Sequence, residues 1–545
     1  MIEPKLSFDL RGQYNIAYHV CTRHCEEGRG DQVAFRWIES GDRRRDYSFR
    51  ELNEESNRVA NALESLGVKT GEVVFTFLPK HPLQFFSFLG ILKMQAIAGT
   101  LFSNFGEEAL LDRLGDSHAA LVITKKALLK KVLRIHDKLP GLRKILLIDA
   151  DAHQSEEVLS LPLLMQQASA QYNILPTPAH TPSVLHYTSG STGKPKGVQH
   201  IHQSLLLQSW TAEHILGLKA GDTYWCTADQ GWVTGTSYGI IGPWSLGITQ
   251  IHYGGTYDAA VWMELLQNEK VDVWYTAPTA LRMLMREDPA LFAAYRLDRL
   301  RHIFSVGEPL NPEVIHWGRE VLKHDIFDTW FQTETGSIMI CNRPDIEIRP
   351  GSMGKPIEAI EAAIIAENGN ILGVKETGNL CIRAGWDSMF ISYLNHPEVY
   401  AGKFAQGYYY SGDLAWKDMD GYYWFVGRND DVINTAGHLI SPFEIESALL
   451  EIPEIAESAV IAAPDDILFE KVVAYIRLRE GYSWNDDLEM RIRLHLSNKL
   501  SSIATPQDMK VIDEIPKNKS GKIMRRVLKA WYMGEDPGDI STLDI

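Results

Sequence analysis

The sequence predicts an α/β protein with largely parallel sheets, followed by a β-rich region and a smaller α+β unit. Strand-like runs alternate with amphipathic helices through about the first four hundred residues, which is typical of parallel sheets covered by helices. After about residue 350 the strands become short and turn residues separate them. A chain of 545 residues also exceeds one hydrophobic core, so roughly three or four domain-scale units are expected.

The first long helix is predicted from a capping box, because Ser48 is followed three residues later by Glu51. An apolar stripe runs at helical spacing from Leu52 to Leu66, and Gly67 ends the helix. The stretch 83–102 is broken by polar residues, so we expect a buried helix and then a strand rather than a membrane span. Strands are expected at residues 72–78, 120–124, 144–148, 271–275 and 302–306.

The second half predicts three further parts of the chain. Short strands are expected at residues 362–365, 379–382 and 421–426, which together suggest a β-rich subdomain at about 350–427. The segment 428–433 is a short polar junction. Residues 434–545 have a typical domain size and are expected to form a compact α+β domain. The N-terminal domain would then span residues 1–427.

Composition restricts the possible partners and compartments. The formal net charge of −16 argues against nucleic acid, which favours a basic surface, but leaves room for a local pocket of lysines. The five cysteines are few and scattered, which fits a reducing cytoplasm. No apolar signal sequence follows Met1. Cys21 and Cys25 alone lack the further ligands that a metal site needs.

The segment 187–197, Tyr-Thr-Ser-Gly-Ser-Thr-Gly-Lys-Pro-Lys-Gly, predicts a polyphosphate site. Its glycines let backbone amides approach oxygens, and its hydroxyls and lysines add donors and charge. It is not a Walker loop, since Thr188 and Pro195 replace residues that this motif requires. Taken alone, the segment also fits a flexible surface turn. The candidate phosphate ligands are Thr188, Ser189, Gly190, Ser191, Thr192, Gly193, Lys194 and Lys196.

Six later segments carry further candidate chemistry, although each alone also fits a turn or a solvated face. Residues 305–309 end a strand on a glycine turn, where ligands sit in parallel sheets. Residues 328–336 join aromatic walls to Glu334, which suits Mg²⁺ on phosphate oxygens. Asp413 and Arg428 suit ribose and phosphate. Residues 434–438 form a turn that fits a narrow channel, and residues 516–522 place a lysine before a basic helix at 523–531.

Together and in this order, these motifs resemble the adenylate-forming superfamily of acyl-CoA synthetases, luciferases and peptide-synthetase adenylation domains. The likeness spans essentially the whole chain and is strongest to the acetate–CoA ligases (acetyl-CoA synthetases), especially the shorter bacterial type. It implies a large domain with two mainly parallel sheets and a mobile C-terminal domain. The segments that carry it are Asp229-Gln-Gly-Trp-Val-Thr-Gly235, Trp274-Tyr-Thr-Ala-Pro-Thr279, Ser305-Val-Gly-Glu-Pro-Leu-Asn-Pro312, Asp328-Thr-Trp-Phe-Gln-Thr-Glu334 and Lys522-Ile-Met-Arg-Arg526.

The resemblance implies two half-reactions with ATP, Mg²⁺ and coenzyme A. A carboxylate would attack the α-phosphate to give an acyl-adenylate and pyrophosphate, and the thiol of coenzyme A would then displace AMP. Lys522 would bridge the reacting groups in the first transition state, and Glu334 would hold Mg²⁺. Asp430 would be the hinge of a swing that removes Lys522 and brings Ala436 and Gly437 beside the thiol.

The same resemblance implies the remaining binding roles. Most of the residues concerned would surround the nucleotide, and Arg113 would contact the nucleotide of coenzyme A. The implied nucleotide contacts beyond the loop at 187–197 are Gly307, Glu308, Pro309, Asp328, Thr329, Trp330, Thr333, Asp413 and Arg428.

The acyl pocket and the thiol channel depart from the closest relatives. Phe331 stands where acetate-specific members usually carry a second tryptophan, while Val233, Thr234 and Val306 match the other walls. Phenylalanine still indicates a short-chain gate, with room for one or two methylenes at about 0.8 kcal/mol each. Acetate and propionate are therefore expected first, then butyrate. Leu439 replaces an arginine and Ala436 a serine common in these synthetases.

Two alternatives and one form of regulation remain open at this stage. The acyl acceptor could be a carrier-protein thiol or another group, or the preferred acid could be of medium chain length. A nucleotide-binding sensor without chemistry is opposed by Lys522, Glu334 and the intact phosphate loop. Acetylation of Lys522 would remove the charge that the first half-reaction needs, which implies a lysine acetyltransferase and deacetylase as partners.

Overall fold

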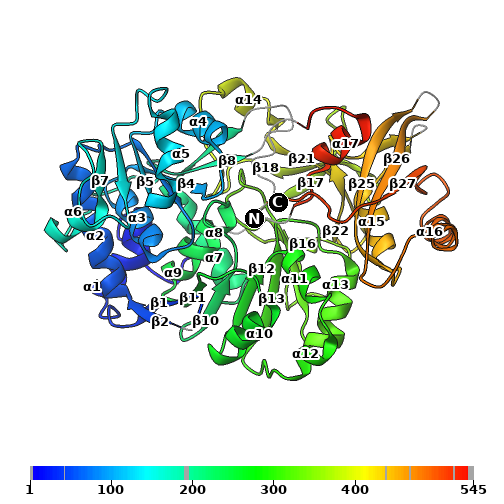
Figure 1. The fold of residues 1–545 in the computed structure, drawn as a ribbon, viewed down its shortest axis with the longest axis horizontal. Coiled ribbons are helices and arrows are strands. Elements are labelled where there is room, and N and C mark those ends of the chain that lie inside the picture. Colours follow the sequence, from blue (N-terminus) through cyan, green and yellow to red (C-terminus); the bar gives the residue numbers. More distant parts are fainter. Residues whose placement is uncertain are drawn as a thin grey trace.

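The computed structural model describes residues 4–41, 43–188, 195–435, 438–465, 468–518 and 522–537. The first two thirds of the chain build two large sheets that lie side by side with helices around them, and the last hundred residues form a smaller unit beside them (Figure 1). We refer to the part before residue 428 as the large unit and to the part from Ile433 onward as the C-terminal unit.

The first large sheet has eight strands in the order β19-β9-β8-β4-β3-β5-β6-β7. The run from β8 through β4, β3, β5 and β6 to β7 is parallel, and β9 and β19 add an antiparallel edge. Two buried apolar clusters cover its faces. The strands are β3 (Val73–Leu78), β4 (Ile97–Phe102), β5 (Leu121–Thr124), β6 (Lys144–Leu147), β7 (Val158–Ser160), β8 (Pro182–Thr188), β9 (Lys196–Ile201) and β19 (Ser392–Tyr393).

The second large sheet has nine strands in the order β16-β15-β14-β13-β12-β10-β11-β1-β2. Its centre, from β14 to β1, is parallel and runs through the largest apolar core. The strands are β1 (Val33–Ile38), β2 (Arg44–Ser48), β10 (Thr223–Cys226), β11 (Thr249–Tyr253), β12 (Val273–Thr276), β13 (His302–Val306), β14 (Ile326–Trp330), β15 (Ile340–Cys341) and β16 (Lys355–Pro356).

Helices connect and cover these sheets. The predicted capping box is present at the start of α2, where Ser48 and Glu51 exchange hydrogen bonds. The apolar stretch after residue 82 is a buried helix, α3, followed by β4, as predicted. The helices are α1 (Arg23–Glu26), α2 (Phe49–Ser65), α3 (Pro82–Lys93), α4 (Glu107–Asp116), α5 (Lys126–His136), α6 (Leu161–Gln167), α7 (Leu205–His214), α8 (Val233–Thr236), α9 (Gly242–Ser245), α10 (Ala259–Asn268), α11 (Pro278–Leu284), α12 (Pro289–Ala293), α13 (Pro312–Trp317) and α14 (Pro397–Ala401).

The β-rich part is an antiparallel sheet in the order β17-β18-β21-β20, with β22 paired to β21. The strand β22 ends at Arg428. The first residue of the predicted polar junction at 428–433 is therefore the last residue of this strand. The strands are β17 (Ala362–Ile365), β18 (Gly378–Arg383), β20 (Phe404–Ala405), β21 (Tyr408–Lys417) and β22 (Tyr423–Arg428).

The C-terminal unit is a five-stranded sheet in the order β24-β23-β26-β25, with β27 beside β26, and it appears in orange and red in Figure 1. Apolar side chains pack on both of its faces, against α15 and α16 on one and α17 on the other. Its elements are β23 (Ile433–Thr435), β24 (His438–Ile440), α15 (Pro442–Leu450), β25 (Ile455–Asp465), β26 (Phe469–Leu478), α16 (Asp486–Lys499), β27 (Asp508–Val511) and α17 (Arg525–Met533).

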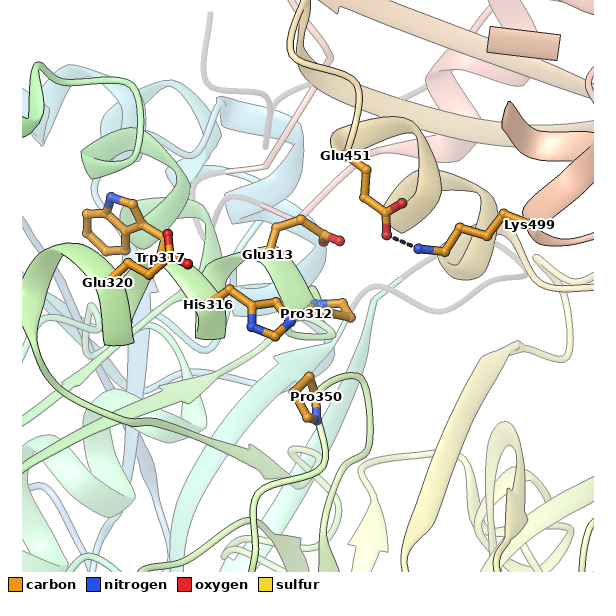
Figure 2. Close-up of a pocket in the computed structure, with 8 residues that line it drawn as sticks. All are labelled: Pro312, Glu313, His316, Trp317, Glu320, Pro350, Glu451 and Lys499. Atoms are coloured by element: carbon orange, nitrogen blue, oxygen red, sulfur yellow. Dashed lines mark hydrogen bonds and ion pairs between the residues drawn. The ribbon is translucent and has the colours of Figure 1, made fainter. Parts of the chain in front are cut away.

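The two units meet along α13 and α15. Asn311 donates a side-chain hydrogen bond to Ser447 Oγ at 2.9 Å. Beside this contact lies a recess of about 570 Å³, lined by Glu313 of the large unit and by Glu451 and Lys499 of the C-terminal unit (Figure 2). Polar groups therefore line this part of the boundary, as is typical of interfaces between domains that move relative to each other.

Two further properties of the described ranges concern membrane spans and metal sites. Within those ranges, no helix combines the length and the apolar character that crossing a bilayer requires. The same residues bring together no group of three or more His, Cys, Asp or Glu side chains able to hold a metal ion. All five cysteines are free thiols, and Cys21 and Cys25 form no bridge.

Candidate active site

The centre of the candidate site is a cross-strand pair of opposite charge. Asp413 of β21 lies directly opposite Arg428 of β22 in the antiparallel register, and Arg428 Nε is 3.5 Å from Asp413 Oδ1. Cross-strand neighbours on one face of a sheet always meet in this way. Burial raises the pKa of Asp413, while Arg428 and the Trp330 indole oppose that shift. The pair therefore presents a carboxylate that is held in place but little hydrated.

The end of β14 fixes the orientation of this carboxylate. Trp330 Nε1 donates to Asp413 Oδ2 at 2.9 Å, and Gln332 Nε2 donates to the same oxygen at 3.0 Å. Tyr409 in turn donates its hydroxyl to Gln332 Oε1 at 2.9 Å. Charge-assisted hydrogen bonds of this kind are among the stronger ones in proteins. One carboxylate oxygen is thus fully engaged, and its position is set without any ligand.

The carboxyl end of β13 carries the glycine turn that the sequence singled out. Gly307 has a φ of +98°, and a Cβ atom placed there would meet nothing within 4 Å. The turn therefore needs glycine for its backbone, and it leaves open space above it. Glu308 accepts from Thr279 Oγ1 at 2.7 Å and pairs with Arg282. Pro309 follows in the same turn.

Below that turn, Asp328 and Thr329 lie buried on β14. Thr329 Oγ1 donates to the Ser305 carbonyl at 2.7 Å and bonds the Tyr275 hydroxyl, so it ties β14 to β13 and β12. Asp328 Oδ1 is buried without a hydrogen-bond partner. Burial raises the pKa of Asp328 to about 8, because the charged carboxylate loses its hydration.

Glu334 lies on the loop after β14, next to β19 of the first large sheet. Its Oε1 accepts from the Tyr393 hydroxyl at 2.7 Å. The loop is held in place at Gln332, the residue before Thr333, by the hydrogen bonds that Gln332 makes to Asp413 and Tyr409. His200 Nε2 also bonds the Thr333 carbonyl at 2.8 Å. A single carboxylate that shares Mg²⁺ with substrate phosphates is the usual arrangement for this ion. Glu334 therefore fits that role.

Three cations, Lys403, Arg428 and Lys196, lie near the two carboxylates Glu334 and Asp413. Burial lowers the pKa of Lys403. Glu334 and Asp413 act to raise this pKa, and Arg428 and Lys196 act to lower it. All five groups therefore interact electrostatically. A Cβ atom placed at Gly412 would lie 3.8 Å from both Lys403 Nζ and Arg428 Nη2. A positive pocket thus exists on a chain of formal net charge −16. Such a pocket suits a polyanion.

Lys522 comes to this pocket from the C-terminal unit. Its residue is exposed to solvent, and it interacts electrostatically with Arg428, Asp431 and Asp413. Desolvation of the ammonium lowers the pKa of Lys522, and Arg428 lowers it further, while Asp431 and Asp413 oppose the shift. The Lys522 ammonium therefore lies within electrostatic range of the Asp413 pair.

The phosphate loop is described only at its two ends. Thr188 ends β8 and Lys196 begins β9, and these strands pair antiparallel with Thr188 opposite Lys196. Lys196 Nζ lies 6.0 Å above the Tyr393 ring, beside the partner of Glu334. The predicted ligands Ser189, Gly190, Ser191, Thr192, Gly193 and Lys194 lie outside the described residues, as do Ala436 and Gly437 in the predicted thiol channel.

The predicted acyl-pocket residues come from three different elements. Val306 ends β13, and Val233 and Thr234 begin α8, all three being buried. The ring of Phe331 meets Tyr238 edge-on at 5.5 Å between centroids. Tyr238 lies just after α8, so this contact joins the end of β14 to the α8 region. Tyr238 is itself anchored, because its hydroxyl bonds Thr211 at 2.8 Å and accepts from the Ile338 amide.

Three predicted residues lie outside this centre. Arg113 is a buried residue of α4 whose guanidinium covers the Phe105 ring at 4.2 Å and lies 6.0 Å from the Tyr187 ring, next to the phosphate loop. Asp430 is exposed between β22 and β23, with Arg428 Nε 3.6 Å away. Leu439 is 56% exposed and is not part of the cation pocket.

Comparison with known protein families identifies the chain. The AMP-binding enzyme family matches residues 21–394, and the AMP-binding enzyme C-terminal domain matches residues 444–522. The chain belongs to the AMP-binding enzyme family. The two matched ranges fall on either side of β21 and β22, so the Asp413–Arg428 pair lies between them.

Several relatives of this AMP-binding enzyme are similar over nearly their whole length. It is 46% identical to acetyl-coenzyme A synthetase of Bacillus subtilis (strain 168) over 535 residues, covering 98% of this chain and 93% of that one. It is 36% identical to acetyl-coenzyme A synthetase of Methanothrix thermoacetophila, covering 99% and 86%. Among solved structures, an anthranilate CoA ligase, AuaEII, in complex with anthranoyl-AMP has a TM-score of 0.88 at 29% identity, covering 96% and 98%.

Sequence reasoning missed several residues of this AMP-binding enzyme's site. Lys403, Tyr393 and Tyr409 lie in segments with no recognisable motif, and only the tertiary fold brings them to Glu334 and Gln332. Tyr238, which supports Phe331, is likewise a core residue by sequence. Gln332 was within reach, because it stands between Phe331 and Glu334 in a motif already singled out.

Proposed function

We propose that this chain is an AMP-forming acid–thiol ligase that converts acetate or propionate, ATP and coenzyme A to acyl-CoA, AMP and pyrophosphate through an acyl-adenylate. The observation that carries the proposal is the Asp413 carboxylate, which Trp330, Gln332 and Arg428 hold and which interacts electrostatically with Lys522. This arrangement occurs in a chain that belongs to the AMP-binding enzyme family and resembles acetyl-coenzyme A synthetases along its whole length.

The nucleotide would lie between the ends of β13, β14 and β21. Asp413, with one oxygen already bonded, would accept hydrogen bonds from ribose hydroxyls, and Arg428 would assist. The open space above Gly307 suits a flat adenine, flanked by the backbone of Gly307–Pro309 and by the segment of Asp328, Thr329 and Trp330. We assign the phosphates to the loop from Thr188 to Lys196, with Thr333 near the α-phosphate.

In the first half-reaction, a carboxylate oxygen would attack the α-phosphorus, and the bond from phosphorus to the β-phosphate oxygen would break. Negative charge builds up on the phosphate oxygens, and Lys522 and the cation pocket would stabilise it. Glu334, oriented by Tyr393, would hold Mg²⁺, which supplies further charge neutralisation when bound. Because little covalent chemistry falls to the protein, catalysis rests on positioning and preorganised charge.

In the second half-reaction, the thiolate sulfur of coenzyme A would attack the acyl carbon and release AMP. We propose that the C-terminal unit swings about Asp430 between the two steps, within the junction 428–433 that joins a domain at 1–427 to one at 434–545. That swing would withdraw Lys522 and bring Ala436 and Gly437 to the thiol. Arg113 would contact the coenzyme A nucleotide.

The size of the acid would be set by Phe331, Val306, Val233 and Thr234. Support comes from the anchored contact between Phe331 and Tyr238, because a ring that packs against a bonded tyrosine cannot easily move aside for a longer chain. Acetate and propionate would therefore be preferred, followed by butyrate.

The test is the ratio of kcat/KM for acetate, propionate, butyrate and hexanoate, measured as coenzyme A-dependent formation of AMP. A peak at two to four carbons that collapses by hexanoate is expected. A flat or rising profile would contradict the short-chain assignment. Formation of AMP without any dependence on coenzyme A would favour the second candidate, an enzyme that loads a carrier-protein thiol or another acceptor.

We also propose two features of the cellular setting. Acetylation of Lys522 would remove its charge, so a lysine acetyltransferase and a deacetylase would control the first half-reaction. A cytoplasmic location is supported by the five free thiols, which a reducing compartment preserves. Full adenylation activity in chemically acetylated protein would contradict this regulation.

A further inference from the structure

A buried carboxylate of the C-terminal unit lies among cations from both units. Glu457 on β25 has a side chain only 6% exposed, and Lys517 Nζ is 2.8 Å from its Oε2. Arg477, its partner in the register of β25 and β26, approaches Oε1 at 3.7 Å. The third cation is Arg286, which pairs with Glu457 from just beyond α11 in the large unit. Glu457 is thus an acid of one unit that binds an arginine of the other.

Lys517 is also the base of the loop that carries Lys522. An antiparallel bridge joins Lys517 to Ile523, so these two residues lie side by side. Within it, the Asn518 amide donates to the Lys522 carbonyl at 2.9 Å, and the Lys522 amide donates to Asn518 Oδ1 at 3.0 Å. The position of Lys522 is therefore tied to that of Lys517 through its neighbours Asn518 and Ile523.

The large unit meets Lys517 with the residues that support the glycine turn. Arg282 pairs with Glu308 and bonds Thr279 Oγ1 at 2.8 Å and Asn311 Oδ1 at 3.2 Å. Lys517 lies in the field of both Arg282 and Glu308. Burial lowers the pKa of Lys517 to about 7, and Arg282, Arg286 and Arg477 repel its charge while Glu308 attracts it. The same crowding lowers the pKa of Arg286 to about 10.

The balance of charge at this contact is therefore delicate. Four cations, Arg282, Arg286, Arg477 and Lys517, meet across the boundary of the two units, and the two carboxylates Glu308 and Glu457 separate them. Removing Glu457 leaves Arg286 facing Lys517 and Arg477 with no acid between them. Removing one partner of a buried ion pair destabilises a protein by more than the intact pair stabilises it, because the other charge stays buried without compensation.

We propose that Glu457, Arg286 and Lys517 form an interdomain latch that holds the C-terminal unit in the orientation that turns Lys522 toward the nucleotide site. They are positioning residues, since they act through the lysine loop rather than on the substrate. The inference rests on the proposed two-step function. It adds a device that favours the first half-reaction and must open before the second, and it places that device next to the support of the adenine turn.

The decisive experiment compares the two half-reactions in Glu457→Gln. We expect ATP–pyrophosphate exchange driven by acetate to fall about tenfold or more in kcat, with the KM for acetate little changed. Release of AMP from supplied acetyl-adenylate by coenzyme A should be unchanged or faster. The matched control is Glu454→Gln, which removes a nearby carboxylate that pairs with Arg491 inside the C-terminal unit. Equal loss in both half-reactions, or equal behaviour of the two variants, would overturn the latch.

A second pair of variants keeps the test independent of folding of the C-terminal unit. Arg286→Met changes only the large unit, and it should reproduce the selective loss of pyrophosphate exchange. The double variant with Glu457→Gln should lose little more than either single variant, because both remove the same contact. Fully additive losses would contradict a shared latch. Arg319→Met, an exposed arginine that pairs with Asp325, serves as the control for charge on the large unit.

The orientation itself can be measured without turnover. Spin labels at two exposed positions, Leu133→Cys in the large unit and Leu494→Cys in the C-terminal unit, report the distance between the units. A single narrow distance is expected with intact Glu457, and a broader or second population in Glu457→Gln. Unchanged distances would contradict the proposal. Failure of the proposed function is distinguishable, because unaltered protein would then show no acetate-dependent pyrophosphate exchange at all.

Discussion

Two regions of the candidate site carry charge in opposite ways. Asp413 lies buried on β21, and the neighbouring side chains of Trp330, Gln332 and Arg428 hold its carboxylate at distances of 2.9 to 3.5 Å. Lys522 lies on a loop of the C-terminal unit, is exposed to solvent, and meets the site only through the field of Asp413, Asp431 and Arg428. One group is built into a sheet, and the other is delivered by a separate unit.

The difference teaches how the site divides its work. A binding group gains from being fixed beforehand, because no free energy is then spent on ordering it when the ligand arrives. A group needed in only one of two half-reactions gains from being removable. The polar boundary between the units, with Asn311 bonded to Ser447 and the recess beside Glu313, is suited to such movement.

The largest effect is expected from removing Lys522, the group that the C-terminal unit brings to the site. Lys522→Ala should lower acetate-dependent ATP–pyrophosphate exchange by about 10²–10³, or about 3–4 kcal/mol, because one preorganised charge is lost from the transition state. Thioester formation from supplied acetyl-adenylate should fall far less. Lys510→Ala, which changes an exposed lysine of β27, is the matched control. An equal loss in both half-reactions would show that Lys522 is not specific to the first.

A smaller effect is expected from changing Asp413, the group that is fixed within the β-rich sheet. Asp413→Asn keeps the shape but removes the charge, so the KM for ATP should rise about 10- to 100-fold, the usual worth of a charge-assisted hydrogen bond. The effect should be alike for acetate and propionate, since the acid is not contacted. Asp420→Asn, on the same hairpin but 61% exposed, is the control. A change in acid preference instead of ATP affinity would contradict the assignment of Asp413 to the ribose.

The acyl pocket sharpens the comparison because it is also built into the large unit. Phe331→Gly should raise kcat/KM for hexanoate relative to acetate, by about 0.8 kcal/mol for each methylene that becomes buried. Phe331→Trp should shift preference toward acetate over propionate. Both ratios come from AMP formation with coenzyme A. Profiles that stay unchanged in both variants would exclude Phe331 as the gate.

The smallest effect is expected from Glu313, at the boundary between the large unit and the C-terminal unit. Burial and the nearby Glu451 raise the pKa of Glu313 to about 7 (Figure 2). A raised carboxyl pKa contributes stability that is complete below about pH 4.5 and is lost as pH rises through about 7. Glu313→Gln should therefore gain stability relative to the unaltered chain between pH 5 and 8, by about 1 kcal/mol after solvent screening. Thermal unfolding midpoints at each pH provide the measurement, and a constant difference would contradict it.

Much of the fold was predictable because its signals are local. The capping box at Ser48 and Glu51, the buried helix α3 and the strand β13 appear where the sequence predicts them. Ends of elements were less accurate, as at β22, whose ladder continues through Arg428 because Asp413 pairs with it. The family was predictable from motifs, and the family comparisons confirm it. The roles of individual site residues remain predictions.

The sequence by itself determined the class of the fold, the family, and the residue types from which the site is built, since each of these depends on short segments whose physical chemistry is local. Only the tertiary structure decided which distant groups meet. Lys403 beside Glu334, Tyr238 behind Phe331, and Arg286 against Glu457 come from segments without a motif. Their contacts depend on how sheets and units pack, and packing joins residues that carry no signal of each other along the chain.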